Sequence, residues 1–91
     1  MITHVAIKDI HGTVWSLPKP NRHAHIFLKN KEQGIDNIPL RQGTQGFLKD
    51  NEIFLRRKPA YHEAKICNQL KDPKRNLASY GNVELYSEDI W

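Results

Sequence analysis

Two stretches near the start of the chain, residues 3–8 and 13–18, alternate apolar and polar residues. Alternation with a period of two is typical of strands that bury one face. His11-Gly12 lies between them and supplies a turn, because glycine readily adopts a positive φ. The pattern predicts an N-terminal β-hairpin, whose second strand ends at Pro18 because proline cannot donate to a sheet ladder.

A first helix is predicted over about residues 22–33, where apolar residues recur at spacings of three and four. Asn21 suits the N-cap of this helix, and Gly34 suits its C-terminal cap. Residues 34–43 contain glycine, proline and few periodic apolar positions. We therefore expect a loop there.

A second β-hairpin is predicted where two apolar runs, 45–48 and 53–55, flank the polar turn 49–52. A second helix is expected from about 59 to 71, because its first residue is a proline, which a first helical turn accepts. Asp72-Pro73 then stops the helix, since the residue before a proline disfavours helical geometry.

The second predicted helix carries one apolar arc of about 160°. Its members are Ala60, Ala64, Ile66, Cys67 and Leu70. Glu63 falls inside this arc, where a carboxylate must be paired, lie at the rim of the core or serve a purpose.

The remaining residues complete the expected topology. Residues 72–83 are polar and should form a loop, and residues 83–86 could add a short C-terminal strand. The predicted order is ββαββα, which gives an α+β fold with two β-hairpins and two helices. Residues 1–91 form a single domain in this interpretation.

The chain of 91 residues is 38% hydrophobic and 26% charged, the balance of a globular domain rather than a disordered segment. A domain of this size has a thin core, so we consider a homodimer. The one cysteine, Cys67, excludes an internal disulfide and a multi-cysteine zinc site and suits a reducing cytosol. No signal peptide or membrane-spanning stretch is visible, so we expect no membrane partner.

The net charge of +4 is unevenly distributed. Residues 1–83 hold all 14 Lys and Arg but only 7 of the 10 acids, a net charge of +7, whereas residues 84–91, the tail, hold three acids and no base. We expect Trp91 or Ile90 to dock onto the body, with Glu88 and Asp89 near its basic groups. The alternative is an exposed interaction peptide. Docking would partly neutralise the body and disfavour nucleic-acid binding.

Arg22 and His23 form the first candidate site, because they lie in a first helical turn whose free N–H groups attract anions. They could hold a phosphate or carboxylate, or the turn could be solvated with His23 stacked on Phe27. His23 and His25 point about 200° apart on a helix and could share a metal ion only on a strand. We therefore expect no metal site and no cofactor.

Arg56, Arg57 and Lys58 form the second candidate site, because cations before a helix N-terminus oppose its dipole and do not favour the helix. They could contact phosphates, pair with the acidic tail or simply be solvated. Lys71, Lys74 and Arg75 extend this positive surface.

Gln45-Gly46-Phe47 opens a strand with a glycine that permits close approach of another backbone. It could form the wall of a ligand site, or a bulge followed by a core phenylalanine. Cys67 lies in the apolar arc and His62 lies on another face of the helix, so we do not expect a Cys/His nucleophile.

A set of short motifs runs through the chain and closes with Leu-Tyr-Ser-Glu-Asp-Ile-Trp at residues 85–91. The others are Arg22-His23, Gln45-Gly46-Phe47, Phe54 with Arg57, and Ala60 with Ala64 and Gln69. Through them the chain resembles a family of small, mostly uncharacterised bacteriophage and prophage proteins. It departs from the family pattern at four positions: Ala24 in place of a second histidine, Glu52 and Asn68 in place of glycines, and Glu63 in place of an apolar residue.

The resemblance implies a phage origin, the cytoplasm of the infected host cell, and a part in modulating or blocking host systems, including antiviral defence such as CRISPR immunity. It implies no established reaction. We therefore expect a non-enzymatic protein that binds an anionic, nucleotide-like ligand or a host protein. The expected ligand contacts are Arg22, His23, Gln45, Phe47, Arg57 and Gln69, in which Arg and His hold phosphate, Gln reads a base or ribose edge and Phe stacks.

Two other functions stay open. The chain could be a nucleic-acid-binding accessory protein that uses Arg56, Arg57 and Lys58. It could also be a small hydrolase with His23 or His25 as a general base.

Overall fold

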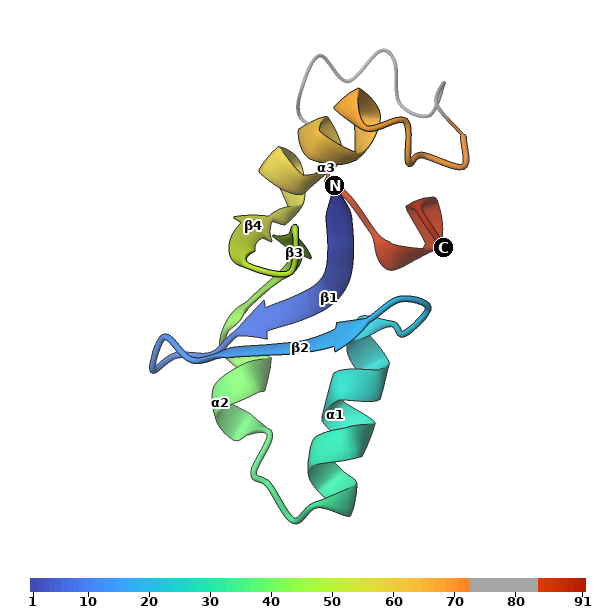
Figure 1. Ribbon diagram of the computed structural model, residues 1–91. Coiled ribbons are helices and arrows are strands. Elements are labelled where there is room, and N and C mark those ends of the chain that lie inside the picture. Colours follow the sequence, from blue (N-terminus) through green and yellow to red (C-terminus); the bar gives the residue numbers. More distant parts are fainter. Residues whose placement is uncertain (73–83) are drawn as a thin grey trace.

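A computed structural model describes residues 1–72 and 84–91 (Figure 1), so the predictions for residues 73–83 lie outside the described residues. Within the described residues the fold is α+β, as predicted, with a four-stranded antiparallel sheet, three α-helices and one 3-10 helix. The strands are β1 (Ile2–Lys8), β2 (Val14–Pro18), β3 (Thr44–Lys49) and β4 (Ile53–Arg56). The helices are α1 (His23–Glu32), α2 (Ile38–Arg41), α3 (Arg57–Ile66) and the 3-10 helix η2 (Ser87–Asp89).

Strand β1 joins the two predicted hairpins, since the sheet has the order β2-β1-β3-β4. Val5 of β1 pairs with Phe47 of β3, and Phe47 pairs with Leu55 of β4. Residues in one such row share a face of the sheet. A register shift between Ile2 and His4 turns Ile2 to this same face, where it joins the core.

Both hairpin turns contain residues with positive φ. Gly12 has a φ of 86°, and Asp50 and Asn51 have φ values of 51° and 59°. Asp and Asn adopt this left-handed region more readily than other residues with a Cβ. The N–H of Glu52 closes the second turn by donating to the carbonyl of Lys49 at 3.0 Å. Both predicted hairpins are confirmed.

Helix α1 ends as the sequence predicts. Gly34 has a φ of 74°, and the N–H groups of Gly34 and Ile35 donate to carbonyls of the last turn at 3.1 and 2.8 Å. This is the usual glycine cap of a helix C-terminus. The N-cap is Arg22 rather than Asn21, because the Asn21 side chain donates to the carbonyl of Pro18 instead.

Helix α3 spans Arg57–Ile66, so the predicted range 59–71 was wrong at both ends. The first N–H groups of a helix have no partner inside the helix, so a proline fits anywhere in the first turn. Pro59 therefore does not mark the residue at which α3 begins. Asn68 has a φ of 57° and ends the helix. The N–H groups of Asn68 and Gln69 donate back to the last turn at 3.2 and 2.8 Å, as in a glycine cap.

The loop expected over residues 34–43 is wrong in part, because Ile38–Arg41 form α2. Pro39 lies in the first turn of α2, where its missing N–H costs no hydrogen bond. Leu40 is only 2% exposed and attaches this short helix to the core. An isolated pair of apolar residues shows no helical period, so the sequence gives little signal for a single turn.

The strand expected over residues 83–86 is wrong for residues 84–86, and Val83 lies outside the described residues. The main chain of Leu85 bonds to α3, where its N–H donates to the carbonyl of Arg57 at 2.9 Å. The Leu85 side chain is fully buried. Burial of Leu85 and contacts with Arg57 of α3, rather than pairing with the sheet, therefore hold this segment.

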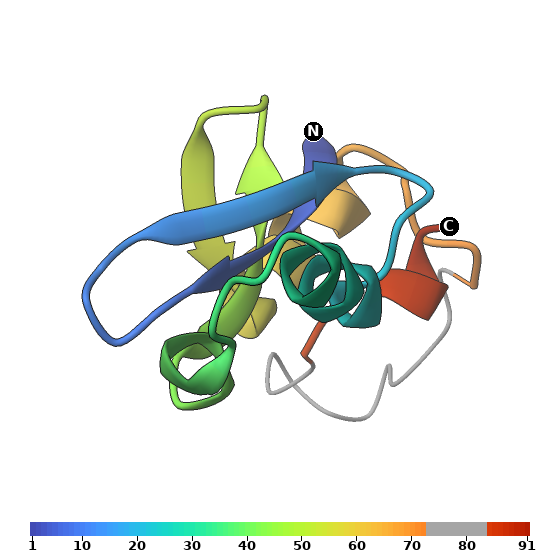
Figure 2. The ribbon, with the colours of Figure 1, turned by 90° about the horizontal axis from the view of Figure 1, so that it is seen from below.

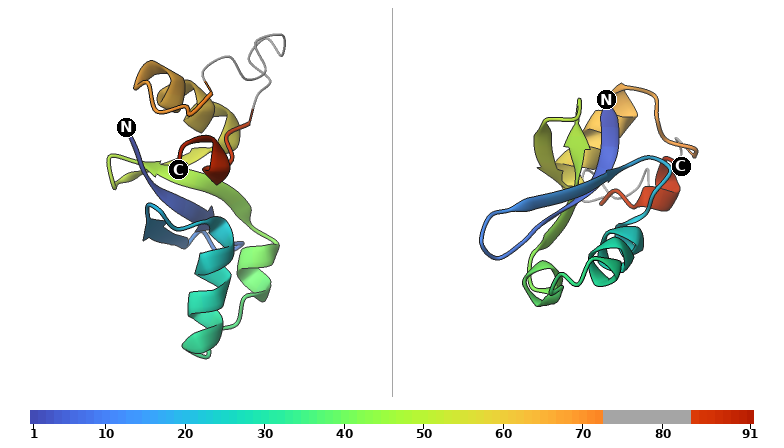
Figure 3. Two further views of the ribbon diagram at one scale, coloured as in Figure 1. Left: turned by 90° about the vertical axis from the view of Figure 1, so that its right-hand side faces the viewer. Right: turned by 60° about the horizontal axis from the view of Figure 1, so that its bottom comes forward.

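One apolar cluster holds the sheet, helices and tail together. It includes Val5 and Phe47 of the sheet, Ile26 of α1, Ala60 and Ala64 of α3, and Leu85 of the tail. The apolar arc predicted for the second helix is correct for its alanines, but Ile66 is 81% exposed. Helices α1 and α2 extend from one end of the molecule, opposite α3 (Figure 1). The C-terminal segment, drawn in red, lies beside the start of α1 (Figures 2 and 3).

Candidate functional site

The start of α3 and the start of β3 together form a groove of about 350 Å³, which we call the α3 groove. Its lining includes Thr44, Gln45, Arg56, Arg57, Lys58 and Glu84. Gln45 and Arg57, two of the six predicted ligand contacts, thus lie beside two members of the predicted basic surface. The chain brings them together because β4 leads directly into α3, whereas β3 pairs with β4.

Arg57 is the most firmly positioned cation of the α3 groove. Its Nη2 donates to Oε1 of Gln45, and its guanidinium carbon lies 4.5 Å from the centre of the Tyr86 ring. Its carbonyl accepts the N–H of Leu85. Contacts from β3 and from the tail therefore fix one guanidinium, a group whose planar fork suits phosphate or carboxylate oxygens.

The electrostatics of the α3 groove favour an anion. Arg56 is the N-cap of α3, and Arg57 and Lys58 are its first two residues, with no acid in the first turn. Free N–H groups already make a helix N-terminus positive, and three cations add to that potential. Among the described lining residues Glu84 carries the opposing charge. This arrangement is costly for an isolated helix and suited to binding a negatively charged group.

Arg22 lies at the tail, apart from the residues that line the α3 groove. Its Nη2 donates to the main-chain oxygen of Trp91 at 2.8 Å, and its Nη1 lies 3.4 Å from the Glu88 carboxylate. The Trp91 indole donates to the carbonyl of Asn21 at 2.7 Å. The prediction that the tail docks through Trp91 is confirmed, and Glu88 lies near Arg22 as predicted. Asp89 accepts the Tyr86 N–H within the tail at 2.8 Å.

His23 and Phe47 are buried beneath the tail. His23 is 8% exposed, and its Nε2 lies 2.7 Å from the carbonyl oxygen of Gly46. Because a carbonyl only accepts, Nε2 carries the proton. Burial lowers the pKa of His23 more than the Gly46 hydrogen bond raises it, so the ring is neutral near pH 7. The Phe47 ring lies between His23 and Trp91, at centroid distances of 5.1 and 6.4 Å.

Gly46 allows the neighbouring strand β4 to approach β3 closely. A Cβ at this position would collide with the carbonyl oxygen of Leu55 and lie 2.8 Å from the Phe54 ring. The predicted close backbone approach at Gly46 is therefore confirmed, and Phe47 is a core residue. His25 has a separate role, since its Nδ1 accepts the Arg22 N–H at 2.9 Å.

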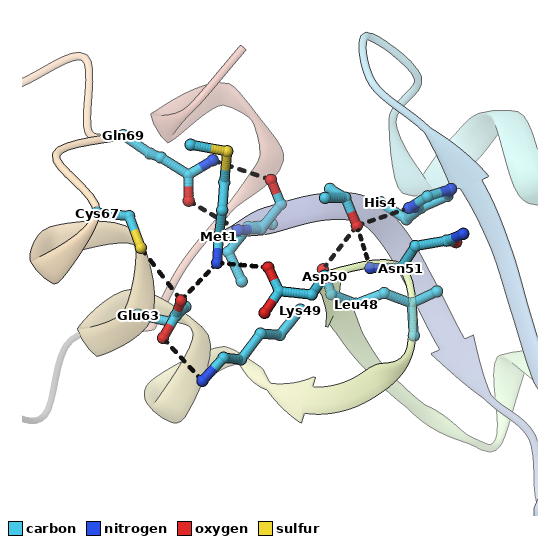
Figure 4. A network of polar contacts seen from close by, with 11 residues as sticks. Met1, His4, Leu48, Lys49, Asp50, Asn51, Glu63, Cys67 and Gln69 are labelled. Atoms are coloured by element: carbon cyan, nitrogen blue, oxygen red, sulfur yellow. Dashed lines mark hydrogen bonds and ion pairs between the residues drawn. The ribbon is translucent and has the colours of Figure 1, made fainter.

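Gln69 contacts main chain in the described structure (Figure 4). Its Oε1 accepts the Ile2 N–H at 2.8 Å, and its Nε2 donates to the Ile2 carbonyl at 2.9 Å. These two bonds satisfy the start of β1 as another strand would. The left-handed cap at Asn68 turns the chain so that Gln69 can reach Ile2.

Glu63 has partners that the sequence did not identify (Figure 4). Its carboxylate lies 2.6 Å from the Met1 amino group and 3.4 Å from Nζ of Lys49, and it accepts the Cys67 thiol at 3.2 Å. The amino group, which Asp50 also contacts, lowers the pKa of Glu63 to about 2, and Glu63 raises the pKa of the amino group to about 10. The sequence signal for these contacts was that Glu63 lies inside an apolar arc, where a carboxylate needs a partner.

The other predicted basic residues lie elsewhere or outside the described residues. Lys71 is exposed, and its N–H donates to the carbonyl of Asp89 at 2.8 Å. Lys74 and Arg75 fall within residues 73–83. In residues 1–72 and 84–91 no group of three or more His, Cys, Asp or Glu could hold a metal ion. Among the same residues no helix is long and apolar enough to cross a membrane.

Comparison with known proteins places the chain among phage proteins. A family model described as "Phage T4 y16D protein" matches residues 1–91. No curated protein and no solved structure matches the chain. The family match agrees with the resemblance to small phage proteins that the sequence motifs indicated.

Proposed function

Because the chain belongs to the phage T4 y16D protein family, we propose that it is a non-enzymatic binding protein that counters a host system in the infected cell. The host system would be one that uses small anionic ligands, as antiviral defence with nucleotide signals does. The ligand of this proposal is nucleotide-like and binds in the α3 groove. One observation carries the proposal, namely the gathering of Arg56, Arg57, Lys58 and Gln45 around a single groove.

Each group of the α3 groove has a distinct part in the proposal. Arg57 binds two phosphate oxygens through its planar fork, because Gln45 and Tyr86 already hold it in place. Arg56 and Lys58 are exposed and supply charge beside it. Gln45 accepts from Arg57 through Oε1, and its Nε2 is a donor of the kind that reads a base or ribose edge.

The other expected ligand contacts act at a distance in this proposal. Arg22 and Phe47 hold the tail, which carries the Tyr86 ring beneath Arg57. His23 and Gln69 bind main-chain groups of the sheet. They position the strands and the tail that form the α3 groove, so their substitution should lower stability before it lowers affinity.

Calorimetry of the purified chain against cyclic nucleotides and ADP-ribose derivatives tests the proposal. We expect at least one of them to bind, and amide signals of Gln45, Arg57 and Lys58 to shift on its addition. Binding that shifts other amides, or no binding at all, would contradict a nucleotide site in the α3 groove. The host-protein form of the proposal would then be the one to pursue.

Nucleic-acid binding is the second candidate, since Arg56 and Lys58 are exposed and flank Arg57 in the sequence. It predicts an affinity for DNA or RNA that falls steeply with salt, because each neutralised phosphate releases a counterion. Loss of Arg56, Arg57 and Lys58 together should flatten that dependence. A flat salt response of the unaltered chain would exclude this function.

A further inference from the structure

Helices α1 and α2 enclose a second groove, of about 540 Å³, at the end of the molecule opposite α3. We call it the α1–α2 groove. Its lining residues are Ala24, Phe27, Leu28, Lys31, Asn37 and Arg41. The proposed function does not use this groove, and none of the six expected ligand contacts lines it.

The α1–α2 groove presents apolar surface to solvent. Leu28 is 56% exposed and Phe27 is half-buried in its wall. Ile38 of α2 lies at the adjoining surface and is 60% exposed. Large apolar side chains gathered on one exposed face are a common mark of an interaction site.

Two cations line the same groove. The guanidinium carbon of Arg41 lies 6.0 Å from the centre of the Phe27 ring, and Lys31 lies on the next turn of α1. In the described part of the chain no acid lines this groove, and the adjoining surface that holds Ile38 contains one, Asp36. The groove therefore combines an apolar wall with positive charge, the complement of a segment that is both acidic and apolar.

The α1–α2 groove is held open by the fold. The Asn37 side chain donates to the carbonyl of Phe27 at 2.9 Å and so fixes α2 against α1. The buried residues Ile26 and Leu40 attach the two helices to the core. These contacts leave Leu28 and Ile38 without a part in the core, and a preformed groove lowers the cost of binding.

We propose that the α1–α2 groove docks an acidic segment of a host protein. An apolar side chain of that segment packs between Phe27 and Leu28, and its carboxylates pair with Lys31 and Arg41. A second copy of this chain fits less well, because a two-fold contact places the same surface on both sides. It would bring Lys31 and Arg41 against their own copies, which like charges oppose.

A photo-cross-linker placed at position 28 of the full chain tests this proposal in host cells. The matched control is the same group at position 14, since Val14 is also exposed but lies on β2. We expect position 28 alone to give an adduct whose attached peptide, mapped by mass spectrometry, carries acids and an apolar residue. A synthetic peptide of that segment should bind the purified chain. A peptide in which Asn and Gln replace its acidic residues should bind at least about tenfold more weakly.

Charge reversal separates this proposal from the proposed function. Lys31→Glu and Arg41→Glu should each lower the affinity for the mapped peptide about tenfold or more, whereas Lys19→Glu on another surface should not. The same variants should keep nucleotide binding at the α3 groove. Thermal unfolding shows whether each variant is folded. If Arg41→Glu does not fold, Arg41→Gln replaces it in the binding measurement.

Four results would overturn the docking of an acidic segment. They are an adduct with a second copy of the chain, an adduct with nucleic acid, no adduct at position 28, and peptide binding that charge reversal leaves unchanged. A second-copy adduct would assign the α1–α2 groove to a homodimer instead.

Discussion

The guanidinium of Arg57 lies over the ring of Tyr86, 4.5 Å from its centre, and so joins the α3 groove to the tail. A cation over an aromatic face at an exposed site contributes about 0.5–1 kcal/mol. Tyr86→Leu should therefore weaken anion binding about two- to fivefold, because Arg57 loses the surface that positions it. Calorimetry checks this, with Tyr86→Phe as the control that keeps the ring and should keep the affinity.

Lys58 should act against stability and in favour of binding. It lies in the first turn of α3, where a cation opposes the helix dipole. Lys58→Glu should raise the free energy of unfolding by about 0.3–1 kcal/mol while it weakens anion binding. Lys65→Glu is the matched control in the last turn of the same helix, and it should lower the free energy of unfolding by a similar amount. Urea unfolding measures the change in the free energy of unfolding for each variant. Changes of the same sign in the two variants would disprove the electrostatic explanation.

Glu63 should make stability depend on pH at both ends of the range. Its pKa falls from 4.5 to about 2 on folding, so its contribution is present above pH 4.5 and is lost as pH falls toward 2. The pKa of the Met1 amino group rises from 8.0 to about 10, so that contribution is present below pH 8.0 and is lost as pH rises through 10.

Urea midpoints of the unaltered chain and of Glu63→Gln, measured from pH 2 to 11, test this coupling. The difference between the two should be largest between about pH 4.5 and 8.0 and should shrink at both ends. In Glu63→Gln the amino group keeps its contact with Asp50 at 3.0 Å, so part of the alkaline loss should remain. Two parallel curves would show that Glu63 does not carry the coupling.

Asn68 should tolerate glycine better than alanine. Its φ of 57° lies in the left-handed region, where a Cβ costs about 1–2 kcal/mol and Asn is partly exempt. Asn68→Ala should lower the free energy of unfolding by about 1 kcal/mol, and Asn68→Gly should leave it equal or higher. Thermal unfolding at one pH distinguishes them, and an alanine variant as stable as the glycine variant would contradict the left-handed cap.

The sequence predicted elements whose signals are local. The N-terminal hairpin follows from period-two alternation around a glycine turn, and the second hairpin follows from two apolar runs around a polar turn. Docking of the tail follows from the tryptophan that it carries. The end of α3 was missed because Asn68 acts as a glycine does, and nothing in its neighbours shows that it is left-handed. Helix α2 was missed because one turn is too short to show a period.

The candidate site was predicted only in part because it depends on contacts distant in sequence. Gln45 and Arg57 meet because β3 pairs with β4 and β4 runs into α3. A two-hairpin topology allows this contact but does not specify it. The sequence places His23 in the first turn of a helix, where its neighbours give no sign that it is buried. Only the folded sheet shows that its ring reaches the carbonyl oxygen of Gly46.

The central claim is that Arg57 holds an anionic, nucleotide-like ligand in the α3 groove. Calorimetric titration of Arg57→Gln and Arg41→Gln with the ligand that the unaltered chain binds best tests this most directly, because each variant removes one arginine from one groove. We predict that Arg57→Gln loses about tenfold or more in affinity while Arg41→Gln stays within about twofold of the unaltered chain. Equal affinities of the two variants would contradict the claim.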